Sequence, residues 1–277
     1  MIQSAPLQPD KPFGHFSPRG LTAVVLAICA GLPSRWPGAH ALNKLLRAPL
    51  KRGPATQFDV AIDGLKLRLR NRGNYCELRQ LFEPQFFDVA EIDWLAREMS
   101  EGGCFVDIGG NIGLYSLHVA QRSPAGTRVV AVEPDPALGQ RMRFNAASND
   151  LDIELAAVAL SDYAGTGTLT LGAHQSGQNA LDTGSDGIEV PVITLMSLCQ
   201  QQSIEHIRAM KIDIEGHEDR VLRSFFDTAP ESLWPQALVI EHTHDDTHIT
   251  HRLQSELGYR QVARTRRNLL LKRAPAA

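Results

Sequence analysis

From Cys104 onward, short apolar runs alternate with amphipathic stretches that are long enough to form helices. The runs are Cys104–Ile108, Val129–Val132, Ile153–Leu160, Ala209–Ile214 and Ala237–Ile240. Strands this apolar are buried on both faces, so the alternation predicts a mostly parallel sheet with helices on each side.

Two regions depart from this alternation. Gly167–Leu171 and Ile188–Ile193 are predicted to be strands joined by a polar loop. Within it, His174–Ala180 is interpreted either as a mobile acceptor-binding or lid loop or as a surface loop without function. Tyr259–Thr265 and Asn268–Lys272 are separated by two residues, too few for a crossover helix, so these strands should pair antiparallel.

Residues 1–99 follow a different pattern. We expect residues 1–57 to form a basic, partly apolar extension. Residues 58–99 are predicted to hold a β-hairpin over Phe58–Arg70, with Asp63-Gly64 as its turn, and a helix over Phe86–Met99. Residues 100–277 then form the main α/β domain.

The apolar stretch Leu21–Leu32 has 12 residues, whereas about 20 are needed to cross a bilayer. It is predicted to be a packed helix or a shallow contact with a membrane surface, helped by the basic residues between Lys44 and Arg52. The alternative is a signal-peptide core, because the sequence Ala-His-Ala at 39–41 resembles a cleavage site.

Composition narrows the class of protein. The chain has 277 residues, 43% of them hydrophobic, so it can bury a full core. Four cysteines without a CxxC pair are typical of a reduced, cytoplasmic protein and give no support to a zinc site. The net charge of −3 argues against a nucleic-acid partner. Residues 1–75, however, carry 11 Lys or Arg against 3 Asp or Glu, which favours association with the inner face of a membrane.

The main chemical signal is the run FVDIGGNIG, in which a strand leads into a glycine-rich turn and then a helix near Leu114. Glycines let a ligand approach the backbone, and the N–H groups at a helix start favour an anionic group. Glu133 ends the next strand, where a carboxylate can accept hydrogen bonds from ribose hydroxyls. The turn should therefore bind a nucleotide or a cofactor with an amino-acid part.

The loop spacing narrows the choice of cofactor. It matches neither G-x-G-x-x-G nor G-x-x-x-x-G-K-[ST], so it disfavours a dinucleotide site and excludes a Walker-type phosphate loop. Asp107 at the entrance of the loop would repel phosphates but suit a cationic ligand. S-adenosylmethionine meets these demands together, because it carries positive sulfonium and ammonium groups, a carboxylate for the backbone N–H groups and a ribose for Glu133.

Five segments, in order, resemble the FkbM-type family of S-adenosylmethionine-dependent methyltransferases: VDIGGNIGLYS, VVAVEPD, ALSDYAG, MKIDIEGHEDRVL and VIEHTH. The resemblance implies an α/β, Rossmann-like class I methyltransferase fold, with a mostly parallel seven-stranded sheet and a C-terminal antiparallel strand. It also implies that Asp162 lies near the adenine. The residues expected to contact the cofactor are Asp107, Gly109, Gly110, Asn111, Gly113, Glu133 and Asp162. The family's more usual loop has Ala where this chain has Gly110.

Methyl transfer to oxygen requires alignment with the donor and removal of a proton from the acceptor. Side chains at the carboxyl ends of the later strands are the natural candidates. Alternation along the strand places Lys211, Asp213 and Glu215 on one face. Asp213 is our first candidate for the transfer centre, followed by Glu241 and His242. An ion-paired structural network around Lys211 is the alternative.

The sequence assigns no metal ligand. The histidines at 242, 244, 248 and 251 invite a metal hypothesis, but the same segment suits the capped start of a helix. If a divalent ion such as magnesium is a cofactor, carboxylates such as Asp213, Glu215 and Glu241 would hold it.

We therefore interpret the chain as an S-adenosylmethionine-dependent O-methyltransferase. The family resemblance implies a hydroxyl of a sugar, glycan or glycolipid precursor as the acceptor. The alternatives are a polyketide or other secondary-metabolite hydroxyl as acceptor, a nicotinamide-dependent oxidoreductase on the same sheet, and a non-catalytic module that retains the fold.

Overall fold

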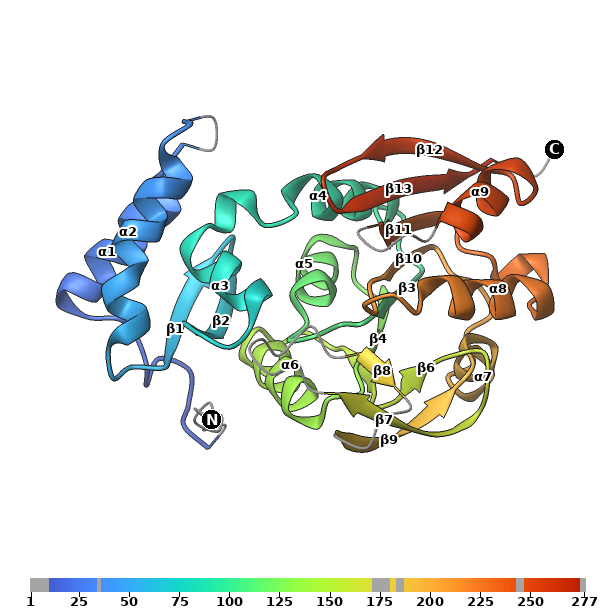
Figure 1. Ribbon diagram of the computed structural model, residues 1–277, viewed down its shortest axis with the longest axis horizontal. Helices are drawn as coiled ribbons and strands as arrows, with labels where there is room; N and C mark the ends of the chain where they lie inside the picture. Colours follow the sequence, from blue (N-terminus) through green and yellow to red (C-terminus); the bar gives the residue numbers. More distant parts are fainter. Residues whose placement is uncertain (1–9, 34–35, 171–179, 183–186, 243–246, 275–277) are drawn as a thin grey trace.

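The computed structural model describes residues 10–33, 36–170, 180–182, 187–242 and 247–274. A seven-stranded sheet with the order β12-β13-β11-β10-β3-β4-β5 forms its centre (Figure 1). Its strands are β3 (Cys104–Ile108), β4 (Arg128–Val132), β5 (Glu154–Ala156), β10 (Ala209–Ile212), β11 (Ala237–Glu241), β12 (Tyr259–Arg264) and β13 (Asn268–Arg273). Within this sheet β13 is antiparallel to both of its neighbours, β11 and β12, and every other neighbouring pair is parallel. This arrangement confirms the predicted fold class, including the antiparallel pair at the end.

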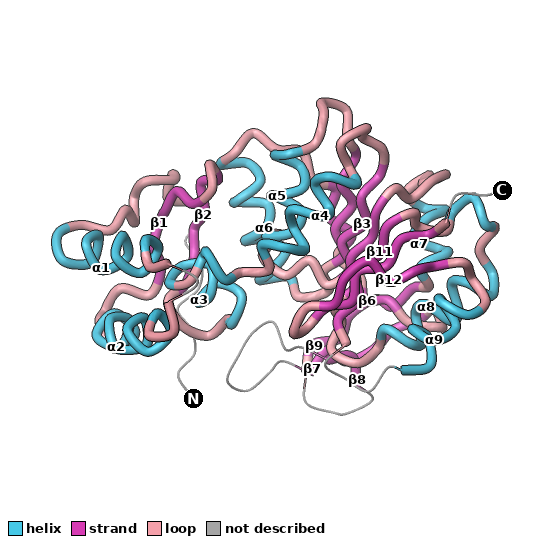
Figure 2. Tube along the Cα trace, turned by 90° about the horizontal axis from the view of Figure 1, so that it is seen from above, coloured by secondary structure: helices cyan, strands magenta, loops and turns pink. Residues whose placement is uncertain are grey.

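Helices cover both faces of the sheet, as Figure 2 shows. On one face, Phe105 and Val129 share a hydrophobic cluster with side chains of α4 (Val89–Glu98), α5 (Leu114–Arg122) and α6 (Pro136–Ser148). On the other, Val106 and Val130 pack with α7 (Leu195–Gln201), α8 (Glu218–Thr228) and α9 (Thr247–Ser255). Neighbouring residues of each strand thus enter opposite layers, which is why the apolar runs are continuous.

The N-terminal elements lie at one end of the molecule (blue to cyan in Figure 1). They are α1 (Gly20–Gly31), α2 (Ala39–Arg52), β1 (Gln57–Ile62), β2 (Leu65–Arg70), α3 (Tyr75–Phe82) and the 3-10 turn η1 (Pro84–Phe86). The predicted hairpin is confirmed, because β1 and β2 pair antiparallel and Asp63 and Gly64 have φ angles of 49° and 82°, typical of a two-residue turn. Leu26 and Leu67 belong to the same hydrophobic cluster as Phe105. The division of the chain after residues 57 and 99 stays a prediction.

Three predicted elements are wrong in their extent. The strand expected over Ala209–Ile214 ends at Ile212, and Glu215 has a left-handed φ of 54°, so Lys211, Asp213 and Glu215 do not share one strand face. The helix expected over Phe86–Met99 begins only at Val89, because Asp88 adopts a left-handed conformation with φ of 39° and separates it from η1. The single strand expected over Ile153–Leu160 divides into β5 and β6 (Ala159–Leu160), because the chain leaves the central sheet after Ala156.

The strand β6 belongs to a second sheet with the order β6-β9-β7-β8. It contains β7 (Gly165–Thr170), β8 (Ala180–Asp182) and β9 (Ile188–Ile193), so both strands predicted in this region are present. The predicted lid loop lies outside the described residues except for Ala180. None of the helices that the structure describes combines the length and apolarity required to cross a bilayer.

On β2 the basic side chain of Arg68 is buried, whereas that of Lys66 is exposed. The Arg68 side chain is 1% exposed and donates to both carboxylate oxygens of Asp59, over 2.7 and 3.0 Å. It also donates to the carbonyl oxygens of Lys11 and Pro12, and its guanidinium lies 4.0 Å from the centre of the Phe144 ring on α6. One buried ion pair therefore joins the hairpin to both the N-terminal segment and α6.

We expect Asp59→Ala to lower the free energy of unfolding by about 3–5 kcal/mol, because it leaves the Arg68 charge buried without its partner. Asp93→Ala is the control: it removes the pair with Arg122, in which the Asp93 side chain is 46% exposed. That change should cost about 1 kcal/mol or less. Denaturant unfolding of both variants measures the difference, and equal small losses would contradict a structural role for the buried pair.

Candidate functional site

A cavity opens at the carboxyl ends of β3, β4 and β10, where the sequence predicts the ligand turn. Residues 109–111 form one side of it, and Glu133, Asp213 and Glu215 approach from the neighbouring strand ends. The helix α3 and the turn between β12 and β13 supply the opposite side. The cavity therefore combines the central sheet with the first and last parts of the described chain.

The glycine turn is held very close to the end of β10. Gly109 has a φ of 75°, and a Cβ atom added to it would lie 1.9 Å from the carbonyl oxygen of Asp213. The N–H groups of Gly109 and Gly110 both donate to the carbonyl of Val132, over 3.0 and 2.9 Å. Only glycine satisfies both the backbone angle and the spacing at position 109.

Glu133 is a buried carboxylate beside this turn, 6% exposed. Its two oxygens accept the backbone N–H groups of Asn111 and Asp135, over 2.8 and 2.9 Å. Burial raises the pKa of Glu133 to about 7, although these hydrogen bonds and the Lys211 charge act in the opposite direction. Each oxygen keeps a lone pair for a further donor, so a ligand hydroxyl can bind here.

An apolar slot continues from the cavity and shares Gly109, Pro134 and Ile214 with it. Its other walls include Val132, Leu160 and Leu169. A narrow apolar space next to a hydrogen-bonding carboxylate suits a flat heterocycle joined to a sugar.

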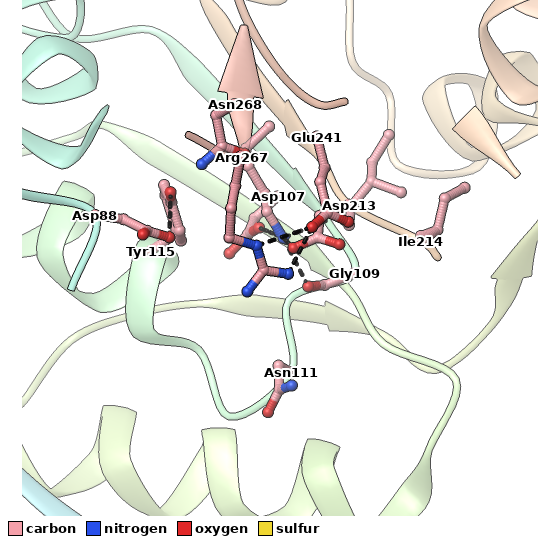
Figure 3. A network of polar contacts seen from close by, with 12 residues as sticks. Asp88, Asp107, Gly109, Asn111, Tyr115, Asp213, Ile214, Glu241, Arg267 and Asn268 are labelled. Atoms are coloured by element: carbon pink, nitrogen blue, oxygen red, sulfur yellow. Dashed lines mark hydrogen bonds and ion pairs between the residues drawn. The ribbon is translucent and has the colours of Figure 1, made fainter. Parts of the chain in front are cut away.

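Lys211 on β10 contacts the charged groups beneath the turn, where Figure 3 shows Asp107 and Asp213 next to Gly109. Its ammonium donates to the carbonyl of Gly109 over 2.9 Å and lies 3.7 Å from both Asp107 and Asp213. Burial alone would lower the pKa of Lys211, but the two carboxylates outweigh it and the pKa rises. The ammonium stays charged and fixes Asp213 at the cavity wall.

Glu241, at the end of β11, is 2% exposed and lies behind Asp213 (Figure 3). Arg267 donates to its Oε1 atom from Nε, over 3.1 Å, and from Nη2, over 2.5 Å. Burial and the Asp213 carboxylate raise the pKa of Glu241 to about 7, against the effect of Arg267. One oxygen each from Asp213, Glu215 and Glu241 lie within 4.8 Å of one another, a spacing at which carboxylates can hold a divalent ion.

The opposite wall is aromatic and polar. The Tyr115 hydroxyl donates to Asp88 over 3.0 Å, and Arg79 lies 3.5 Å from the same carboxylate. The Tyr75 ring has the guanidinium groups of Arg79 and Arg267 at 5.8 and 5.4 Å from its centre. This wall offers both ring faces and hydrogen-bonding groups to a ligand.

The structure brings part of the predicted set together. The predicted residues that line the cavity are Gly109, Gly110, Asn111, Glu133 and Asp213. Glu241 contacts this group from behind, whereas His242 is not among the lining residues and has its Nε2 atom 3.2 Å from the carbonyl of Thr265. His244 lies outside the described part of the chain.

Three predicted cofactor residues lie elsewhere. Asp107 is fully buried and accepts hydrogen bonds from the Ser116 hydroxyl and N–H at the start of α5, over 2.6 and 3.1 Å. Gly113 is the N-terminal cap of α5, with φ of 86°. The Asp162 carboxylate is 46% exposed and lies 3.9 Å from Arg220. In this structure Asp107 and Gly113 shape the turn from below, and the predicted contact of Asp162 with the adenine stays a prediction.

The lining residues that sequence reasoning missed include five with polar groups: Tyr75, Arg79, Asp88, Tyr115 and Arg267. Tyr115 stands in the motif VDIGGNIGLYS, which is the signal that could have identified it, and Arg267 stands in the two-residue turn between the last two strands. The other three come from the N-terminal elements, whose sequence carries no pattern that points to the cavity.

Comparison with known proteins gives a family match. The model of the methyltransferase FkbM domain matches residues 107–261. The 31-O-demethyl-FK506 methyltransferase FkbM of Streptomyces tacrolimicus is 29% identical over 182 residues, which cover 53% of this chain and 68% of that protein. The AMB antimetabolite synthetase AmbE of Pseudomonas aeruginosa is 40% identical over 57 residues, 21% of this chain, and the match spans 3% of that much longer protein.

Among solved structures, the chain is similar to a SAM-dependent methyltransferase from Agrobacterium tumefaciens. The TM-score is 0.48 at 11% identity, and the match covers 81% of this chain and 72% of the other.

The geometry of the turn predicts different tolerance at two adjacent glycines. We expect Gly109→Ala to lower the free energy of unfolding by at least about 2 kcal/mol, because it combines a left-handed backbone with a backbone clash. Gly110→Ala is the matched control. Its added Cβ would meet mainly the flexible end of Met142, at 2.7 Å, so we expect a loss below about 1 kcal/mol. Denaturant unfolding of both variants checks this order, and equal losses would contradict it.

Proposed function

Because the chain belongs to the FkbM methyltransferase family, we propose that it transfers the methyl group of S-adenosylmethionine to a hydroxyl oxygen of a sugar, glycan or glycolipid precursor. The match of the family model over more than half of the chain carries the reaction class. The arrangement of carboxylates around the glycine turn supports the assignment of the donor site.

The residues present fit this donor. No side chain fits at position 109, so a ligand at this turn would meet backbone groups. Each carboxylate oxygen of Glu133 keeps a lone pair that can accept a hydrogen bond from a ribose hydroxyl. The apolar slot beyond Pro134 has the character required for the adenine. The carboxylates of Glu215 and Glu133 favour the positive sulfonium and ammonium groups.

When bound, S-adenosylmethionine supplies a methyl group that the positive sulfonium already activates. The protein has to orient the acceptor hydroxyl and remove its proton. Asp213 is our candidate base, because its carboxylate lines the cavity and Lys211 holds it in place from the strand below. Glu241 acts as a positioning residue behind Asp213, and Arg267 fixes Glu241 in turn.

The wall opposite Asp213 supports a hydroxyl-rich, ring-shaped acceptor. Aromatic faces from Tyr75, Phe87 and Tyr115 stand beside the hydrogen-bonding groups of Arg79 and Asp88. Sugars combine apolar ring faces with hydroxyl edges, and such a wall matches both properties. This chemistry supports a sugar or glycan acceptor, but it also fits other hydroxylated rings.

A polyketide or other secondary-metabolite hydroxyl is the second candidate acceptor. It is favoured by the Streptomyces relative, whose name states methylation of 31-O-demethyl-FK506. Family membership favours methyl transfer over the nicotinamide-dependent alternative.

Incubation of the full chain with the donor and a panel of glycolipids, free sugars and polyketides separates the two acceptor classes by mass spectrometry. Repeating the incubation with magnesium or with EDTA tests whether methyl transfer requires a divalent ion, which Asp213, Glu215 and Glu241 would hold.

We expect Asp213→Asn to reduce methyl transfer by at least about a hundredfold, the usual contribution of a positioned base. Its affinity for S-adenosylhomocysteine, measured by calorimetry, should change by less than about threefold, because a neutral amide of the same size keeps the cavity shape. Asp227→Asn, which alters a carboxylate on α8 that is 58% exposed and paired with Arg252 on α9, serves as the control and should leave both values unchanged. Full activity of Asp213→Asn would remove Asp213 from the catalytic role.

The raised pKa of Glu133 predicts that cofactor affinity depends on pH. Above about pH 7 the carboxylate is ionised and accepts the ribose hydroxyls, whereas below it the group is protonated and its acceptor strength falls. Affinity for S-adenosylhomocysteine should therefore fall by up to about tenfold per pH unit below pH 7. Glu133→Gln should bind weakly at every pH, and a pH dependence that survives in this variant would assign the titration to another group, such as Glu241, whose pKa is also raised to about 7.

A further inference from the structure

The N-terminal helical hairpin formed by α1 and α2 has a charge pattern unlike the rest of the chain. Between Lys11 and Phe58 the sequence contains seven of the 28 Lys or Arg residues and none of the 31 Asp or Glu residues. Neither helix has an acidic residue in its first turn, where one would stabilise the helix dipole. The rest of the chain, taken together, has more Asp and Glu than Lys and Arg, so this region differs from it in the sign of its net charge.

The same hairpin exposes a row of aliphatic side chains. Leu21, Val24 and Ile28 of α1 are 78%, 54% and 44% exposed, and their spacing of three and four residues places them on one face of the helix. The opposite face is occupied, because Leu26 and Cys29 are buried against the protein. A helix without a single charged residue would normally be covered on all sides.

The connection between the two helices and α2 itself also expose both apolar and basic side chains. Trp36, in the connection, is 46% exposed, and Leu45 on α2 is 71% exposed beside the exposed Lys44. Arg52 is exposed at the end of α2, and Arg19 is exposed just before α1. Both helices lie at the end of the molecule farthest from the central sheet, where a flat surface can reach them (Figures 1 and 2).

We propose that the α1–α2 hairpin binds the surface of a membrane that contains anionic lipids. With 12 residues, α1 is about 18 Å long, which suits a helix lying in the interface rather than across it. The aliphatic row would enter the acyl boundary, Trp36 would lie at the level of the headgroups, and the cations would meet lipid phosphates. This inference is independent of the proposed methyl transfer.

Two other occupants match the surface less well. A second copy of the chain would cover the aliphatic row, but it would bring two acid-free, cationic hairpins together. A nucleic acid would satisfy the cations and leave the aliphatic row exposed to water. An anionic lipid surface satisfies both features at once.

The test is flotation of the full chain with vesicles of phosphatidylcholine alone and of phosphatidylcholine mixed with phosphatidylglycerol. We expect binding to the mixed vesicles only, with a loss at high salt. Lys44→Gln and Arg52→Gln should each weaken binding about fivefold. The triple variant Leu21→Gln, Val24→Gln and Ile28→Gln should weaken it more than tenfold.

A matched pair of single variants keeps the test valid if the triple variant misfolds. Val24→Gln should weaken vesicle binding, whereas Val262→Gln on β12, where the valine is 48% exposed, should not. Equal effects of these two variants, equal binding to neutral vesicles, or no binding to the mixed vesicles would overturn the proposal. The proposal would also be overturned if the chain were a dimer that the triple variant converts to a monomer, or if the chain bound duplex DNA more tightly than the mixed vesicles. Calorimetry with S-adenosylhomocysteine on the same samples reports on the donor site separately.

Discussion

The buried ammonium of Lys211 is the interaction on which the site depends. It joins the ends of two adjacent parallel strands, because it contacts Asp107 and the Gly109 carbonyl on one and Asp213 on its own. A charge buried to this degree is tolerated only where partners compensate for the lost hydration. The glycine turn and the candidate base are therefore fixed relative to each other by the same group. These partners explain how a lysine can be buried within a core strand: of the charged residues at 211, 213 and 215, only Lys211 lies on β10, which ends at Ile212.

A second layer of contacts joins the cavity to segments distant in the sequence. Asn74, the cap of α3, donates to the side chain of Asn111 in the glycine turn over 2.9 Å. Across the cavity, Thr265 and Asn268 both donate to Glu91 on α4, over 2.6 and 3.0 Å. The cap of α3 is thus bonded to the turn that faces the donor, and α4 is bonded to the strand pair that follows Arg267. The wall assigned to the acceptor owes its position to these bonds.

The sequence predicts the donor side of the site better than the acceptor side, for a physical reason. The turn around Gly109 and the carboxylate at Glu133 are set by local backbone demands, which leave a pattern within a few residues. Asp107 illustrates the limit of such reasoning, because the pattern places it beside the ligand turn and the structure turns its carboxylate down to Ser116. Tyr75 and Arg79 are neighbours on α3, but they meet Arg267 only through tertiary packing of α3 against the final strand pair. Likewise, the exit of the chain from the sheet after β5 depends on pairing with β9, which no local run of residues can reveal.

The position of β13 has a consequence for synthesis of the chain. It inserts between β11 and β12, although both β12 and β13 come after every other strand in the sequence. While the nascent chain emerges, the hydrogen-bonding edge of β11 stays open until residues 268–273 leave the ribosome. Until then Glu241 also lacks its ion pair with Arg267. The donor turn can assemble co-translationally, whereas the acceptor wall is completed only when synthesis has passed the final hairpin.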